Sequence, residues 1–323
     1  MFALRGIAVA LSAFVLVYGA LSLGVGLCWR AGWARAQRPP VRRGPDLLFA
    51  WRMFPLIAAA VITAAFTVPS FLLLEPRAID EPLGGIPLML GICAVGLGIF
   101  GAMNAAVALR RVSRVVQKWT GAAQPIESSA PIPVLRISAG APPSDTNLPA
   151  MTVAGIVRPR VLLSSAVEAV LTAGELQAAL NHEVVHVRRR DNLKKLMLRC
   201  VAFPGMAGLE SAWLEATEMA ADDAAVSNVS EALDLAAALI KLSRFGPADT
   251  GANLTAALVH RPVSAMNARV TRLITWTDDR LASSYKLSPW YGIGAALAVI
   301  AVFAVTYSQL LVRVHTATEW LVR

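Results

Sequence analysis

Four stretches of the chain are almost entirely apolar and about 20 residues long or longer, the length that a helix needs to cross a bilayer. They lie at approximately residues 6–28, 53–74, 86–109 and 289–312. Between the third and the fourth stretch, apolar and polar positions recur at helical and strand spacing. The pattern predicts three membrane helices in residues 1–110, a water-facing domain over residues 111–287, and a fourth membrane helix with a short tail in residues 288–323.

The first apolar stretch also resembles a secretory signal peptide, because Arg5 precedes an apolar core. It is long for such a peptide, shows no clear cleavage site of small residues, and continues directly into arginines. We therefore expect it to be retained as a membrane helix. The third stretch contains four glycines, which either let a neighbouring helix approach closely or reflect the frequency of glycine in membrane helices: Gly91, Gly96, Gly98 and Gly101.

The charges of the connecting segments predict the orientation of the chain, because cytoplasmic loops carry an excess of lysine and arginine. Residues 29–46 contain five arginines and one acidic residue, whereas residues 75–81 contain three acidic residues. Four basic residues follow the third apolar stretch: Arg110, Arg111, Arg114 and Lys118. We expect residues 29–46 and the domain at 111–287 on the cytoplasmic side, and the tail on the exterior.

The water-facing region begins with signals for strands and loops. Residues 120–150 contain six prolines, and β-branched runs at residues 132–138 and 151–164 predict strands, the second interrupted by a turn near Gly155. Residues 193–216 are apolar but contain basic residues and a proline, which would make a fifth membrane span costly. We expect a helix there that packs on the domain core or dips into the membrane interface.

Composition supports a membrane protein, since 56% of the residues are hydrophobic and 16% are charged. The three cysteines show no paired spacing, so neither a disulfide framework nor a cysteine-based metal site is indicated. The net charge of +9 comes largely from arginines beside the apolar stretches, where membrane topology explains it. No nucleic-acid recognition motif accompanies them, and we expect the lipid bilayer, not nucleic acid, as a direct partner.

A His-Glu-x-x-His motif, His182-Glu183-Val184-Val185-His186, is the strongest chemical signal in a chain with only four histidines. Two histidines four residues apart on a helix project from the same face, so both imidazoles can reach one metal ion. Glu183 lies about 100° around the helix from His182, close enough to hold a water molecule without binding the metal. Such ligands with an open fourth position suit zinc. The competing interpretation is two surface histidines on an ordinary helix.

The residues that flank the motif favour the metal site. Thr172 and Glu175 are typical of a helix start just before it. Glu218, in a later alanine-rich stretch, is a candidate third ligand, and Asp222 lies one turn further on the same face. Asp222 could accept a hydrogen bond from the distal nitrogen of a ligating histidine. Such acidic pairs are common on exposed helices, so this pair indicates a metal site only in combination with the His-Glu-x-x-His motif. One zinc ion is therefore expected, with the ligands His182, His186 and Glu218.

Short motifs around the histidine pair extend over roughly residues 130–275. They are Arg158-Pro159-Arg160-Val161-Leu162-Leu163, Glu175-Leu176, Arg189-Arg190-Asp191-Asn192, Phe203-Pro204, Trp213 and Glu218-x-Ala220-x-Asp222. With the motif they resemble the integral-membrane zinc peptidases of the BlaR/MecR antibiotic-sensor type, which are related to HtpX-like and CAAX-prenyl membrane proteases. The resemblance implies a mainly α membrane protein with a cytoplasmic α+β protease domain of the gluzincin type. It also implies an edge strand that pairs with the extended substrate.

His260 and Arg269 are similar to a His-x-Pro and arginine segment of the HtpX-like relatives. In one interpretation they are catalytic, and stabilise the developing oxyanion or hold Asp222. In the other, His260 caps a helix and Arg269 lies on the surface. Both interpretations stay open at this point.

Motif and resemblance together predict a zinc metalloendopeptidase at the cytoplasmic face of a bacterial-type plasma membrane. Glu183 is expected to take a proton from the attacking water and pass it to the leaving amine. In the similar receptors, an exterior drug-binding domain triggers cleavage of a transcriptional repressor. This chain ends about a dozen residues after its fourth stretch, too few for a folded sensor. Its signal would come from a separate sensor protein, from the membrane, or not at all.

Two other classes of protein share some of these features. A membrane quality-control protease of the HtpX-like kind would use the same chemistry on a broader range of substrates. A non-catalytic membrane scaffold would retain only a relic zinc site, and the intact Glu183 argues against it.

Overall fold

The structure is a computed structural model that describes eleven stretches of the chain, and the fold is given for these. They are residues 2–36, 44–76, 84–121, 123–126, 131–137, 151–201, 203, 205–244, 256–257, 263–277 and 306–319.

Three long helical segments among the described residues are apolar enough to cross a membrane. α1 covers Phe2–Ala36 and α4 covers Gly85–Thr120. Between them, α2 (Gly44–Ile62) continues through a π-helical turn, η2 (Thr63–Thr67), into α3 (Val68–Leu74). All three N-terminal stretches that the hydrophobic pattern predicts fall inside these helices. Large apolar side chains on them are exposed, as a lipid-facing surface requires; Leu23, Ile57 and Ile92 are examples.

The second membrane helix begins earlier than the pattern predicts, at Gly44 rather than near residue 53. Pro45 suits the first turn of a helix, and the carboxylate of Asp46 is favourable at the positive end of the helix dipole. Asp46 also pairs with Lys194 at 2.7 Å. Residues 47–51 are apolar, so the apolar stretch itself extends back across Arg52, and the charge of Arg52 made the predicted start too late.

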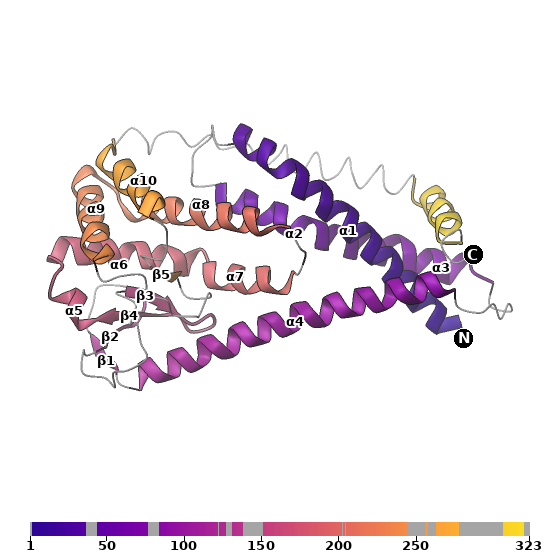
Figure 1. The fold of residues 1–323 in the computed structure, drawn as a ribbon, viewed down its shortest axis with the longest axis horizontal. Helices are drawn as coiled ribbons and strands as arrows, with labels where there is room; N and C mark the ends of the chain where they lie inside the picture. Colours follow the sequence, from indigo (N-terminus) through magenta and orange to yellow (C-terminus); the bar gives the residue numbers. More distant parts are fainter. Residues whose placement is uncertain are drawn as a thin grey trace.

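The predicted fourth membrane stretch, residues 289–312, lies mostly outside the described residues. Residues 306–319 are helical. The hydroxyl of Tyr307 donates a hydrogen bond to the carbonyl oxygen of Ala65 at 2.9 Å, which places this helix beside η2. The start of α1 lies at the same end of the molecule (Figure 1), where Arg5 of α1 and His315 of the last helix both lie close to Glu75. A fourth span stays a prediction.

A five-stranded mixed sheet lies at the opposite end, beside the last turns of α4 (Figure 1). Its strands are β1 (Ala123–Ile126), β2 (Val134–Ile137), β3 (Met151–Ala154), β4 (Arg160–Ser164) and β5 (Ala256–Ala257), in the order β1-β2-β4-β3-β5. Only β2 and β4 run parallel. The predicted strands are confirmed, including the turn after Ala154, where Gly155 adopts φ 96°.

Helices cover the sheet and form the domain core. They are α5 (Ser165–Glu168), α6 (Ala173–Arg188), α7 (Asp191–Cys200), α8 (Ala207–Ala225), α9 (Val229–Ser243) and α10 (Val263–Ile274). Buried side chains of β3, β4, α6, α8, α9 and α10 belong to one cluster that includes Val161, Ala179 and Leu239. The core therefore holds α6, the helix of the histidine motif, between the sheet and α9.

Two helices, and not the single predicted one, occupy residues 193–216. Gly205 adopts φ 89°, which other residues rarely adopt, and it separates α7 from α8. Both helices pack against the membrane helices: Trp213 of α8 clusters with Leu48 of α2 and Tyr18 of α1. Gly101 of α4 lies directly against the carbonyl oxygen of Cys200, so a side chain there would clash.

Close packing does not require the other three glycines of the third apolar stretch. Gly91 faces Ala8 of α1, but a Cβ atom there would lie 3.9 Å from the Ala8 Cα, an ordinary contact, so this helix pair does not require glycine at that position. Gly96 and Gly98 have open space where a side chain would be, so nothing in the fold requires glycine at these two positions.

Candidate metal centre

The helix of the histidine motif, α6, is fixed at its start by a capping box. Thr172 Oγ1 accepts a hydrogen bond from the Glu175 backbone N–H at 3.3 Å, and the Glu175 carboxylate accepts one from the Thr172 N–H at 2.8 Å. Lys241 of α9 pairs with the same carboxylate at 2.7 Å. Burial would raise the pKa of Glu175, but Lys241 and Thr172 outweigh it and lower that pKa. These contacts anchor α6 against α9.

Two turns further on, the imidazoles of His182 and His186 converge. Their Nε2 atoms lie 3.1 Å apart, and both side chains are buried. The carboxylate of Glu218, from α8, lies 3.6 Å from Nε2 of His182 and 3.8 Å from Nε2 of His186. Ligand atoms of the three residues lie within 4.8 Å of one another. Two imidazoles and a carboxylate facing a common point are a donor set that suits zinc.

Each histidine has a buried carboxylate behind it, on the side away from Glu218. Asp222 Oδ1 lies 2.9 Å from Nδ1 of His182, although the angle falls short of a hydrogen bond. Asp191 Oδ2 makes a 2.8 Å hydrogen bond with Nδ1 of His186. A carboxylate at Nδ1 favours the tautomer with the proton on Nδ1, so that Nε2 can bind a metal.

The contact between Asp191 and His186 was not predicted from the sequence. The sequence shows it only as part of the Arg189-Arg190-Asp191-Asn192 run, five residues after His186, where a straight helix would carry it to another face. The chain instead ends α6 and turns at Arg190, which adopts the left-handed conformation with φ 55° and ψ 39°. This turn starts α7 and brings Asp191 back beneath His186. No spacing rule for one helix could have predicted it.

Arg269, from α10, lies inside the site. Its Nε and Nη2 atoms donate to the two oxygens of Asp222 at 2.7 Å each, and its Nη1 lies 3.2 Å from Glu218. Arg269 is 5% exposed, so it is not a surface residue. Arg269 therefore contacts both Asp222 and Glu218. His260, the other candidate from the same segment, lies outside the described residues.

Glu183 is fully buried beside the two histidines, and neither of its carboxylate oxygens has a hydrogen-bond partner in the described part of the chain. A buried carboxylate without a partner is costly, so this position fits a group that a bound metal and its water would complete. Burial also raises the pKa of Glu183, which suits a group that must accept and release a proton near neutral pH.

Burial and neighbouring opposite charges act in opposite directions on the pKa values of His182 and Glu218. Burial would lower the pKa of His182, but Asp222 and Glu218 outweigh it and raise that pKa to about 9. Burial would raise the pKa of Glu218, yet the histidines and Arg269 hold it well below its ordinary value. Glu218 therefore stays ionised, as a metal ligand must be.

The part of the chain that forms this site is similar to a known protein family. Residues 143–273 match a family described as BlaR1 peptidase M56. This segment belongs to the M56 peptidase family. The match spans β3 to α10 and so includes the histidine motif, Glu218, Asp222 and Arg269. No curated protein matches the chain. The match implies a metallopeptidase with a protein substrate, and together with the three apolar helices it supports a membrane peptidase.

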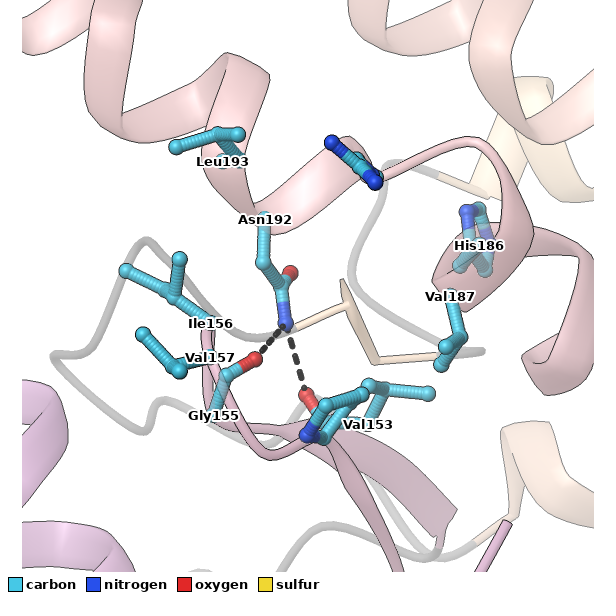
Figure 2. A pocket seen from close by; sticks show the side chains of 10 residues that line it. Val153, Gly155, Ile156, Val157, His186, Val187, Asn192 and Leu193 are labelled. Carbon is cyan, nitrogen blue, oxygen red and sulfur yellow. Dashed lines mark hydrogen bonds between the residues drawn. The ribbon is translucent and has the colours of Figure 1, made fainter.

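A cavity of about 420 Å³ opens beside His186 in this peptidase. Figure 2 shows Asn192 at its centre, donating hydrogen bonds to the carbonyl oxygens of Val153 at 3.3 Å and Gly155 at 3.2 Å. Asn192 thereby ties the start of α7 to the end of β3. Apolar side chains such as Val157 and Leu193 line the rest of the cavity. The cavity thus connects the sheet to the metal centre.

Proposed function

We propose that the chain is a membrane-embedded zinc metalloendopeptidase, with one zinc ion held by His182, His186 and Glu218. The observation that carries this proposal is the convergence of the three ligands beside the fully buried, unpartnered carboxylate of Glu183. Two surface histidines would not be buried, nor would each be backed by a carboxylate. A gluzincin-type site would have this donor set and this acid beside it.

Bound zinc would supply a Lewis acid that polarises the scissile carbonyl and lowers the pKa of a water molecule to about 7. Glu183 would accept the proton of the attacking water at a carboxylate oxygen and then deliver it to the leaving amine nitrogen. Asp222 and Asp191 would hold the two imidazoles with Nε2 free to bind. Arg269 would keep Asp222 and Glu218 in place and offset part of their negative charge.

The substrate would lie as an extended peptide at the end of β3, in the cavity beside His186, because β3 itself is already paired with β4 on one side and β5 on the other. Main-chain groups of the turn that follows β3 would hydrogen-bond the peptide backbone, and such bonds hold a peptide largely irrespective of its sequence. The apolar walls of the cavity would accept one apolar side chain next to the cleaved bond. Arg190, which also lines the cavity, would contact a polar or acidic part of the substrate.

We place this active site at the cytoplasmic face of a bacterial-type plasma membrane, and we assign the enzyme to regulated proteolysis. The arginines of residues 29–46 and the basic residues at the end of α4 support the orientation. A cytoplasmic transcriptional repressor is the proposed substrate, as the likeness to BlaR/MecR receptors implies. A separate sensor protein or the membrane itself would supply the signal.

A comparison of protein termini in whole cells tests the proposal. Cells that express the wild-type chain are compared with cells that express Glu183→Ala at the same level. One or two cytoplasmic termini that vanish in the Glu183→Ala cells, in a small DNA-binding protein, are the expected result. Many scattered termini in membrane proteins would instead indicate quality control, and no difference under any growth condition would contradict an active peptidase.

A further inference from the structure

A second cavity, of about 270 Å³, lies away from the metal centre, where the peptidase domain meets the membrane helices. It is bounded by α2, α4 and the junction between α7 and α8. Four polar side chains line it, together with apolar ones such as Leu97 and Phe100. The polar ones are Arg52, Asn104, Arg199 and Glu210. Polar groups on membrane helices are costly and therefore indicate a function.

Arg52 is the buried polar group of this cavity, with 2% of its surface exposed. Its Nε atom lies 3.2 Å from Glu210, and its Nη2 donates to the carbonyl oxygen of Val201. The guanidinium also interacts with the Tyr18 hydroxyl, but its Nη1 is buried and makes no hydrogen bond in the described part of the protein. A buried guanidinium that lacks one acceptor calls for a ligand with an oxygen at that position.

The cavity lies at the level of the membrane–water boundary. Three tryptophans gather at the adjoining ends of α1 and α2, as belts of aromatic residues do at that boundary: Trp29, Trp33 and Trp51. Trp51 packs against Gly32, and Trp33 packs against Gly44. Arg52 directly follows Trp51 in the chain and so shares its depth. Phospholipid phosphate groups lie at the same level.

The charge and the shape of the cavity restrict the class of ligand further. Two arginines and one glutamate leave the lining with one excess positive charge, which matches a singly charged phosphate diester. Phe100, which is 56% exposed, lines the cavity from the outer face of α4, so the cavity is bordered by the lipid-facing side of that helix. Leu97 and Phe100 would lie along acyl chains, which a free phosphate ion does not have.

We propose that this cavity binds one anionic membrane phospholipid, with its phosphate oxygen on Arg52 Nη1, Arg199 and Asn104 beside the phosphate, and its acyl chains against Leu97 and Phe100. Glu210 lies on α8, the same helix as the metal ligand Glu218, so the lipid would stabilise the membrane end of that helix. The proposal concerns binding alone and does not depend on peptidase activity.

Native mass spectrometry of the full chain, purified in detergent and depleted of lipid, tests the proposal. The chain is titrated separately with phosphatidylglycerol, phosphatidylcholine and inorganic phosphate. Arg199→Glu reverses a charge at the cavity, and Leu97→Trp fills it, while neither change touches the contact between Arg52 and Glu210. Arg111→Glu is the matched control, because Arg111 is an exposed arginine of α4 that does not line the cavity.

The expected result is one phosphatidylglycerol per wild-type chain, bound about tenfold or more weakly by Arg199→Glu and Leu97→Trp and equally well by Arg111→Glu. Arg52→Gln should also lose the lipid, but it breaks the contact with Glu210 as well. Three results would overturn the proposal. They are equal binding by all variants, equal binding of phosphatidylcholine, and displacement of the lipid by inorganic phosphate at similar concentration, which would indicate a site for the free anion.

Discussion

At the scale of single residues, the proposed metal centre would depend on two carboxylates outside the proposed ligand set. Asp191 and Asp222 stand behind the two histidines, and Arg269 holds Asp222 with two hydrogen bonds. Removing one partner of a buried charged contact is expected to cost more than removing an exposed one, because the remaining charge stays buried. The orientation of the imidazoles therefore depends on these three side chains.

Asp191→Asn should weaken zinc binding by about 10- to 100-fold while leaving the chain folded. The amide retains the shape of the side chain but not the charge that favours the proton on Nδ1 of His186. Zinc affinity, measured by competition with a chelator, checks the prediction. Asp223→Asn is the matched control, because Asp223 is also a buried aspartate near the site but pairs with Arg272. Equal zinc affinity in the Asp191→Asn and wild-type chains would contradict this role.

The sequence predicted the three candidate ligands that converge here and the acid beside His182, because a helix places residues three or four apart on one face. It did not indicate the place of Asp191, because the turn at Arg190 is a tertiary feature. It allowed two roles for Arg269, and the structure places the side chain against Asp222 and Glu218. His260 lies outside the described residues, and its role stays a prediction.

At the scale of elements, α6 is the helix on which the site depends, and its first turn is fixed by Glu175. That carboxylate closes the capping box and also reaches Lys241 of α9. Thr172 and Glu175 signalled this helix start in the sequence, whereas the contact with Lys241 links residues far apart and could not be read from spacing. The break between α7 and α8 has a local cause instead: Gly205 adopts φ 89°, and glycine is a residue that commonly interrupts a helix, so the sequence did contain this signal.

Glu175→Gln should lower the stability of the peptidase domain at neutral pH by about 1–2 kcal/mol, through loss of the charged contacts. The pKa of Glu175 is lowered in the folded chain, so its contribution is fully present above the ordinary value near 4.5 and is lost as the pH falls through the lower, folded value. The difference between wild type and Glu175→Gln should therefore shrink in acid. Unfolding followed at several pH values checks this, and a difference that grows in acid would contradict it.

At the scale of the whole molecule, the membrane helices and the peptidase domain share a packed boundary. α2 contacts α8, and α4 contacts α7 and the sheet (Figure 1). Hydropathy predicted the three N-terminal helices well, because about 20 apolar residues are a strong signal. It could not predict where they meet the domain, because there the helices become polar. The fourth span and the domain boundary near residue 287 stay predictions.

The proposed orientation predicts which positions a membrane-impermeant thiol reagent can label in intact cells. In a chain whose three cysteines are replaced by serine, Ser227→Cys should be protected, because the exposed turn between α8 and α9 would face the cytoplasm. Gly85→Cys, at the start of α4, should be labelled, and a side chain fits there without contacts. Permeabilised cells are the control in which both must react. Labelling of Ser227→Cys in intact cells would contradict the orientation.

The most direct test of the account compares Glu183→Gln with His182→Ala in the purified chain, by zinc content and by cleavage of a peptide library. Glu183→Gln should retain one zinc ion per chain and lose activity by about 100-fold or more, because the proton acceptor is gone while the ligands remain. His182→Ala should lose both zinc and activity. A Glu183→Gln chain that cleaves peptides at the wild-type rate would contradict the assignment of the site.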